Sequence, residues 1–392
     1  MTSHTQVQTI SSKGKGVRLA NLVFNDFRHD SRVEKTCRSL ASHGFDVTLF
    51  AFSGEGLPAK EEIDGFRVVR CSGPGRLGSL VGMACRLLGS AREFDAIHCN
   101  DLEPLPLAAM AKLLGGRSVL VYDAHELETE KMAARGMRKY LSRWLEKAFF
   151  VCVDATITVG DKIADWYSAR YDVARPSVVR NAPPVWKRNK TNLLRERFSI
   201  SPDTPIFLYV GSLAKGRAVE ATLDAFSGQK DRALVFIGYG GTSLEGRNLE
   251  ARVRSVARRE PNVYFHDPVP SSELIDCVSS ADVGLSLIED LCLSYRYCMP
   301  NKLFEYGMAG LPVLVSDLPE MRSTIEQYEC GVVCPDITAR GIANAVERIL
   351  NMNLDHLGAN ARVMAEDHCW EKQENALLGL YHGLFSNSGR QS

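Results

Sequence analysis

The sequence predicts an α/β protein of two domains, each built on a doubly wound parallel sheet. At 392 residues, the chain is longer than a single hydrophobic core usually supports. Short apolar runs alternate with helical stretches in both halves, which is typical of open parallel sheets. Polar clusters follow several of these runs, and ligands bind beyond the carboxyl ends of strands in such sheets. We therefore expect the two domains to face a central cleft.

Composition excludes several classes of function. Lys+Arg and Asp+Glu both number 47, so no net charge indicates a nucleic-acid partner. The 11 Cys residues form no Cys-x-x-Cys pair, which favours reduced thiols over disulfides or zinc. No run of ~20 apolar residues predicts a membrane span, and residues 1–16 are polar and expected to be disordered. These features indicate a cytoplasmic protein.

Proline-rich and basic stretches along the chain predict the domain boundaries. A proline-rich stretch with a basic cluster at 187–190 reads as an interdomain linker over 186–204, with one short helix at Asn192–Phe198. The first domain then covers 17–185 and the second covers 205–370. Residues 371–392 provide a last helix and a polar tail.

The first domain is predicted to hold seven strands with helices between most of them. The loop after the first strand lacks Gly-x-Gly-x-x-Gly, which disfavours a dinucleotide site and a nicotinamide dehydrogenase. The expected strands are Val17–Phe24, Val47–Phe52, Phe66–Cys71, Ala96–Cys99, Ser118–Tyr122, Ala155–Val159 and Ser177–Arg180.

Polar residues at these strand ends are candidates for lining the cleft: Asp30, Arg32, Asp101, His125 and Glu126. His125 follows a central strand, where a histidine can hydrogen-bond a sugar hydroxyl or relay a proton. A surface-loop histidine is the alternative. For Asp30, the alternative is a helix N-cap.

A basic, aromatic helix is expected at Lys131–Phe150. Its composition suits an interfacial helix on anionic lipid, which would place the protein peripherally on the inner face of the plasma membrane. The alternative is a helix whose apolar stripe packs on the sheet while its charges lie in water.

The second domain repeats the architecture without a residue-level repeat. Strands are expected at Ile206–Val210, Ala233–Ile237, Val263–Phe265, Val283–Leu287, Pro312–Ser316 and Gly331–Cys334. Glycine turns follow the first two, at Gly211–Arg217 and Gly238–Gly241. Backbone N–H groups in such turns, with a nearby cation, can hold a pyrophosphate.

One stretch, residues 300–316, combines a helix start with a strand. Pro300 suits the first helical turn, and Lys302 and Glu305 share one helix face near its positive end. Glu accepts hydrogen bonds from ribose hydroxyls, while Lys and the helix dipole hold an anion. A capped core helix with a solvated Lys–Glu pair is the alternative.

This stretch resembles the nucleotide-sugar signature of retaining glycosyltransferases of family 4, on residues Glu305, Gly310, Pro312 and Val313. The resemblance implies the GT-B fold, in which two Rossmann-like domains face a central cleft. It implies a UDP- or GDP-type nucleotide sugar on the second domain. It also implies a saccharide or lipid-linked acceptor on the first domain, with Asp30, Arg32, Asp101, His125 and Glu126 as the acceptor-side candidates. It also implies that the terminal helix returns to the first domain.

The chain departs from the family pattern in two places, the first glycine turn and the stretch before Glu305. Ser212 replaces the usual Arg, and Arg217 falls where the family has Lys. Tyr297 replaces a Glu eight positions before Glu305. The donor-binding residues that the resemblance implies are Gly211, Ser212, Lys215, Arg217, Gly238, Gly240, Tyr297, Asn301, Lys302, Leu303 and Glu305.

The mechanism implied is front-side transfer with retention of anomeric configuration. His125, Arg217 and Lys302 are the candidate catalytic residues, and no Asp-x-Asp motif indicates a metal, so fixed cations would stabilise the departing diphosphate. The resemblance points to bacterial polysaccharide or glycoconjugate assembly. A nucleotide-sugar epimerase of the same fold and a non-catalytic nucleotide-sugar-binding protein are the alternatives.

Overall fold

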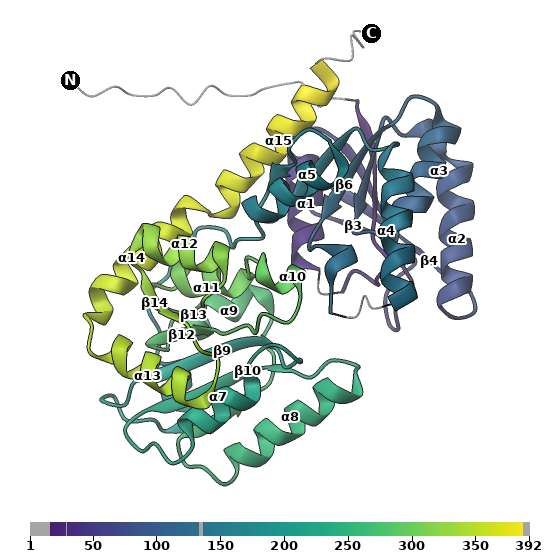
Figure 1. Ribbon diagram of the computed structural model, residues 1–392. Helices are drawn as coiled ribbons and strands as arrows, with labels where there is room; N and C mark the ends of the chain where they lie inside the picture. The colour runs from purple at the N-terminus through teal and green to yellow at the C-terminus, as the bar shows by residue number, and fades with distance from the viewer. Residues whose placement is uncertain (1–15, 29, 133–135, 387–392) are drawn as a thin grey trace, which may run out of the picture.

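Two sheets of alternating α/β topology, parallel except for one edge strand, organise the chain (Figure 1). The computed structural model describes residues 16–28, 30–132 and 136–386. The first sheet has eight strands in the order β3-β4-β2-β1-β5-β6-β7-β8, and the second has six in the order β11-β10-β9-β12-β13-β14. The predicted fold class is therefore confirmed. Predictions for residues 1–15 and for the tail from 387 lie outside the described residues.

The N-terminal sheet is covered by α2 to α5 on one face and by α1 and α15 on the other. Its elements are β1 (Arg18–Leu22), α1 (Ser31–Ser42), β2 (Asp46–Phe52), β3 (Lys60–Ile63), β4 (Phe66–Cys71), α2 (Gly75–Gly89), η1 (Ala91–Glu93), β5 (Ala96–Asn100), α3 (Leu105–Gly115), β6 (Val119–Ala124), η2 (Glu128–Glu130), α4 (Gly136–Phe150), β7 (Ala155–Thr158), α5 (Asp161–Tyr171) and β8 (Ser177–Val178).

Two elements of this domain differ from the sequence prediction. β3 pairs antiparallel with β4 at the sheet edge, and its Lys-Glu-Glu sequence has no apolar run to reveal it. The helix expected from Lys131 is assigned from Gly136.

The C-terminal sheet is also covered on both faces, by α6, α9, α11, α12 and α14 on one and by α7, α8 and α13 on the other. Its elements are α6 (Leu193–Phe198), β9 (Ile206–Ser212), α7 (Val219–Phe226), β10 (Ala233–Tyr239), α8 (Leu244–Ala257), β11 (Val263–His266), α9 (Ser271–Val278), β12 (Val283–Ser286), α10 (Leu293–Arg296), α11 (Asn301–Met308), β13 (Val313–Ser316), α12 (Pro319–Tyr328), β14 (Gly331–Cys334), α13 (Ala339–Leu350) and α14 (Leu354–Asp367).

Two segments cross between the domains. Residues 186–204, predicted as a linker, pack on the second domain: Leu194 lies in its core and the Trp186 indole donates to Asp276 at 2.8 Å. The long helix α15 (Trp370–Ser386) runs back along the first domain (Figure 1). There the Trp370 indole donates to Ser39 Oγ at 3.0 Å, and Tyr381 packs edge-on against Phe45.

Candidate active site

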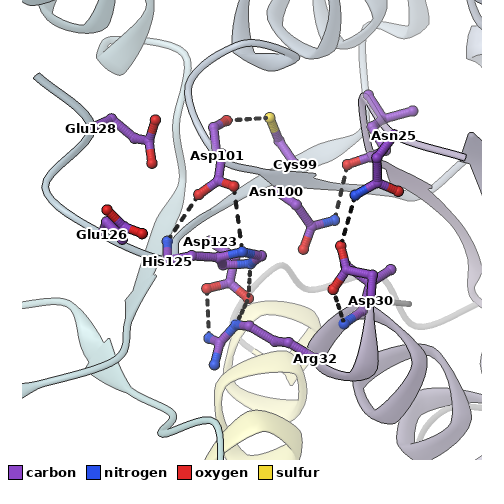
Figure 2. A network of polar contacts seen from close by, with 12 residues as sticks. Asn25, Asp30, Arg32, Cys99, Asn100, Asp101, Asp123, His125, Glu126 and Glu128 are labelled. Carbon is purple, nitrogen blue, oxygen red and sulfur yellow. Dashed lines mark hydrogen bonds and ion pairs between the residues drawn. The ribbon is translucent and has the colours of Figure 1, made fainter. Parts of the chain in front are cut away.

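His125 lies in the loop after β6, held between two carboxylates (Figure 2). Its Nδ1 is 3.4 Å from Asp101 Oδ2, and its Nε2 is 3.6 Å from Asp123 Oδ2. Its backbone N–H donates to Asp101 Oδ1 at 3.1 Å. The imidazole is one-fifth exposed, so it keeps one open side. This histidine is thus oriented by fixed partners, unlike a mobile surface-loop side chain.

Asp123 is the buried anchor of this arrangement. Arg32 donates to it in bidentate fashion, at 3.0 Å from Nε and 2.6 Å from Nη2, and also donates to the Val179 carbonyl at 2.7 Å. His98 Nε2 lies 3.4 Å from the same carboxylate. Arg32 was predicted to face an acceptor, but its buried guanidinium instead holds Asp123 in place. By fixing Asp123, Arg32 also helps to hold the neighbouring His125 in place.

The other three acceptor-side candidates lie in different settings. Asp30 caps α1, accepting from the Val33 N–H at 3.2 Å, as the N-cap alternative predicted. Asp101 contacts His125 directly. Glu126 accepts from Ser294 Oγ on the second domain at 3.2 Å, so it lies where the two domains meet.

The electrostatics around His125 favour its protonated form. Burial alone would lower the pKa of His125, but the carboxylates of Asp101 and Asp123 outweigh burial and raise it to about 9. At neutral pH the ring is therefore an imidazolium whose two N–H groups face Asp101 and Asp123, so it supplies positive charge rather than accepting a proton.

We expect Asp101→Asn to lower the pKa of His125 toward 6.5, because Asp101 contributes the largest raising interaction. The neutral amide retains an oxygen that can accept the His125 N–H bond, so the loop should stay folded. NMR titration of histidine-labelled protein measures this directly. An unchanged His125 titration in the variant would contradict the assigned electrostatics.

The glycine turns of the second domain meet at the carboxyl ends of β9 and β10. Gly211 and Gly238 are register partners, and a Cβ on Gly238 would lie 2.0 Å from the Gly211 carbonyl oxygen. Gly240 packs as closely on Gly246, and its N–H already donates to Glu250 at 2.8 Å. Gly240 was predicted to bind the donor, but its amide is thus occupied. Ser212 is exposed and Gly211 is partly exposed, whereas Gly238 is buried.

Arg217 ends the first glycine turn with its guanidinium over the Tyr295 ring, 4.9 Å from the centroid. Within the described residues it makes no ion pair, so its charge is available to an anion. Lys215 is more than half exposed and lies 4.0 Å from Glu245. It lines a pocket of ≈ 760 Å³ beside α7 and α8. Arg217 is therefore better placed than Lys215 to bind an anion.

Lys302, in the first turn of α11, is the most unusual side chain of this half. It is buried, and its Nζ has no hydrogen-bond partner in the described part of the chain. Its Nζ lies over the Tyr209 ring, 4.0 Å from the centroid. Burial and the nearby Arg217 lower the pKa of Lys302 to about 7. An unpaired buried ammonium is costly, and a bound anion would remove that cost.

The other donor-side candidates lie around Lys302 but face different ways. Glu305 is half-buried, and burial raises its pKa against the opposing charges of Lys35 and Lys302. Asn301 is exposed at the helix start. Leu303 was predicted to bind the donor, but its side chain is fully buried in the core and its N–H donates to Pro300. Tyr297 packs against the core of the first domain.

Sequence reasoning missed Lys35, His98 and Asp123 as contributors. Asp123 stands two positions before His125 at the end of a strand, so the alternation of side chains placed both on one face. Lys35 donates to Asn181 and Ala182 at 2.7 Å each, and its charge reaches Glu305 across the domain boundary. This electrostatic interaction between Lys35 and Glu305 depends on how the two domains are arranged, which no local sequence pattern encodes.

No group of three or more His, Cys, Asp or Glu side chains in the described ranges could hold a metal ion. None of the helices described has the combination of length and apolarity needed to cross a bilayer.

Family models and solved structures match both halves of the chain. The model for Glycosyltransferase Family 4 matches residues 31–182, and the model for Glycosyl transferases group 1 matches residues 204–352. No curated protein matches by sequence. Sucrose-phosphate synthase from Thermosynechococcus elongatus is similar with a TM-score of 0.77 at 20% identity, over 95% of this chain and 100% of that one.

Two further structures share the fold. Anabaena HepE in complex with UDP-glucose has a TM-score of 0.73 at 12% identity, over 93% of this chain and 99% of that one. WaaG, a glycosyltransferase involved in lipopolysaccharide biosynthesis, has a TM-score of 0.67 at 17% identity, over 92% of this chain and 100% of that one. At these identities the likeness concerns the fold.

Proposed function

Because the chain belongs to the group 1, family 4 glycosyltransferases with the GT-B fold, we propose that it moves a sugar from a nucleotide-diphosphate sugar to a saccharide or lipid-linked acceptor, with retention and without a metal. The observation that carries the proposal is Lys302, a buried ammonium without a hydrogen-bond partner beside Arg217. Two neighbouring cations, one in the first turn of α11 and one in the glycine turn after β9, match a diphosphate, which carries two negative charges.

In this proposal each domain has a distinct task. Glu305 accepts hydrogen bonds from the ribose, while Lys302 and Arg217 stabilise the charge that develops on the leaving diphosphate. His125, protonated and held by Asp101 and Asp123, places its positive charge at the end of β6 for the transferred sugar or the leaving oxygen. The acceptor hydroxyl approaches over Asp101 and Glu126, whose carboxylates accept from sugar hydroxyls. The support for this division is the placement of the residues.

The first experiment combines donor binding with product analysis. Thermal shift against UDP-, GDP- and dTDP-sugars should show one series that raises the melting temperature by mass action. Incubating that donor with saccharide and lipid-linked acceptors should give a product of unchanged anomeric configuration, with undiminished turnover in EDTA. Free epimerised sugar would instead indicate an epimerase. Binding without turnover on any acceptor would indicate a non-catalytic nucleotide-sugar-binding protein.

Donor affinity should depend on pH through Lys302. In the donor-free protein the pKa of Lys302 is about 7. Because a bound anion favours the charged form of Lys302, donor binding above pH 7 takes up a proton. The dissociation constant should then rise with pH, by at most about tenfold per unit. Calorimetry at pH 6 to 9, in buffers of different ionisation enthalpy, measures both the affinity and the proton uptake.

The matched control is Lys302→Arg, which keeps its charge throughout this range and should flatten the pH dependence. A wild-type affinity that is constant across the range would remove Lys302 from the anion site.

A further inference from the structure

Helix α4 exposes its apolar stripe to solvent. Met137, Tyr140, Leu141 and Trp144 recur at helical spacing and are 81%, 70%, 52% and 61% exposed. The sequence-based alternative, in which this stripe packs on the sheet, is therefore wrong. An amphipathic helix on the surface of a globular protein normally packs such an apolar stripe against the core.

A buried carboxylate fixes α4 in this rotation. Glu146 accepts hydrogen bonds from the hydroxyls of Tyr122 and Tyr167 at 2.8 Å each, and from Tyr171. Residues in a helix advance about 100° each, so Trp144 lies on nearly the opposite side from Glu146. The only acidic residue of α4 thus points inward while Tyr140 and Trp144 point outward, which is the reverse of an ordinary surface helix.

The two neighbouring helices continue the apolar surface. α3 contacts both α2 and α4, and the three lie on one side of the N-terminal sheet (Figure 1). We call their outer surface the three-helix face. It adds five exposed apolar side chains to those of α4: Leu77, Val81, Met110, Leu113 and Leu114.

The charge on the three-helix face has one sign. Within α2, α3 and α4 the sole carboxylate is the buried Glu146. The cations of the three helices are Arg76, Arg86, Lys112, Arg138, Lys139, Arg143 and Lys147. Four of these pair with acids outside the three helices. Arg86, Arg138 and Lys147 make no ion pair with any described residue.

We propose that the three-helix face docks peripherally on an anionic lipid bilayer. Exposed aromatic and aliphatic side chains with unpaired cations, on helices that expose no carboxylate of their own, match a surface of acyl chains beneath anionic headgroups. A second copy of this chain fits less well, because a two-fold interface would set these cations against one another.

Vesicle flotation without donor or acceptor tests the proposal independently of glycosyl transfer. The full chain should float with vesicles of equal phosphatidylglycerol and phosphatidylcholine, and much less with pure phosphatidylcholine or at high salt. Tyr140→Ser/Leu141→Ser/Trp144→Ser should weaken binding at least about tenfold. Arg138→Glu/Lys147→Glu should weaken it similarly, but only on the anionic vesicles.

The matched control is Leu244→Ser/Val363→Ser, which removes two exposed apolar side chains from the second domain and should leave flotation unchanged. Circular dichroism confirms that each variant is folded. Equal flotation of wild type and both three-helix-face variants overturns the proposal. So does a wild-type dimer that these variants convert to monomer, because the face would then bind a second copy.

Discussion

Lys302→Met is expected to raise the melting temperature of the free protein while lowering kcat/KM by about 10²–10³-fold. Methionine fills a similar volume but carries no charge, so the buried position no longer disfavours folding. The same change removes a cation from the site where charge develops on the departing diphosphate. A lysine kept for packing alone would show neither the gain in stability nor the loss of turnover.

The stability gain should depend on pH in a defined direction. Burial lowers the pKa of Lys302 from 10.5 to about 7 in the folded chain, so the ammonium destabilises folding most fully below pH 7. That penalty fades as the pH rises from 7 towards 10.5. The melting temperatures of wild type and Lys302→Met should therefore differ most in the acidic range and converge at alkaline pH.

Two other cations serve as comparisons. Arg217→Ala should lose about 2–4 kcal/mol of transition-state stabilisation without a gain in stability, because Arg217 is only partly buried. Lys215→Met should alter neither quantity much, since Lys215 is exposed. Thermal denaturation in a pH series and steady-state kinetics on the identified donor measure all three. A lower melting temperature in Lys302→Met would show that its ammonium stabilises the free fold.

The sequence carried the fold because parallel α/β domains have a strong local signature. Apolar runs such as Ile206–Val210 and Val283–Leu287 form strands that are buried on both faces. They can therefore be recognised as strands from the sequence alone. The edge strand β3 has no such run, because only one side of it pairs. Its existence depends on β4 being in place, and a local pattern cannot express that.

The candidate site was predictable where chemistry and local position coincide. Lys302 and Glu305 share a helix start, so their proximity follows from spacing. Arg32 and Asp123 are 91 positions apart, and only the sheet brings them together. The outward face of α4 was also unpredictable, because it depends on three tyrosines of β6 and α5 that bind Glu146.

Asp123→Asn is expected to destabilise the protein by about 3–5 kcal/mol, the cost of leaving a buried partner charge uncompensated. The amide cannot balance the Arg32 guanidinium, which is almost fully buried. Arg32 holds the pKa of Asp123 well below its usual value despite burial, so this contribution is present above about pH 4 and is lost only as the pH falls through the lowered pKa. Urea denaturation at neutral pH measures the difference.

A double variant separates the structural role of this pair from its role in catalysis. Arg32→Met/Asp123→Leu replaces both charges with apolar side chains, and such replacements are often neutral or stabilising, so much of the lost stability should return. Turnover should not return, because His125 loses one of the two carboxylates that keep it protonated and oriented. A double variant that recovers stability and also turns over like the wild type would mean that Asp123 acts only in the fold. A variant that is stable but slow, with a lowered His125 pKa, would show that the buried pair positions the histidine.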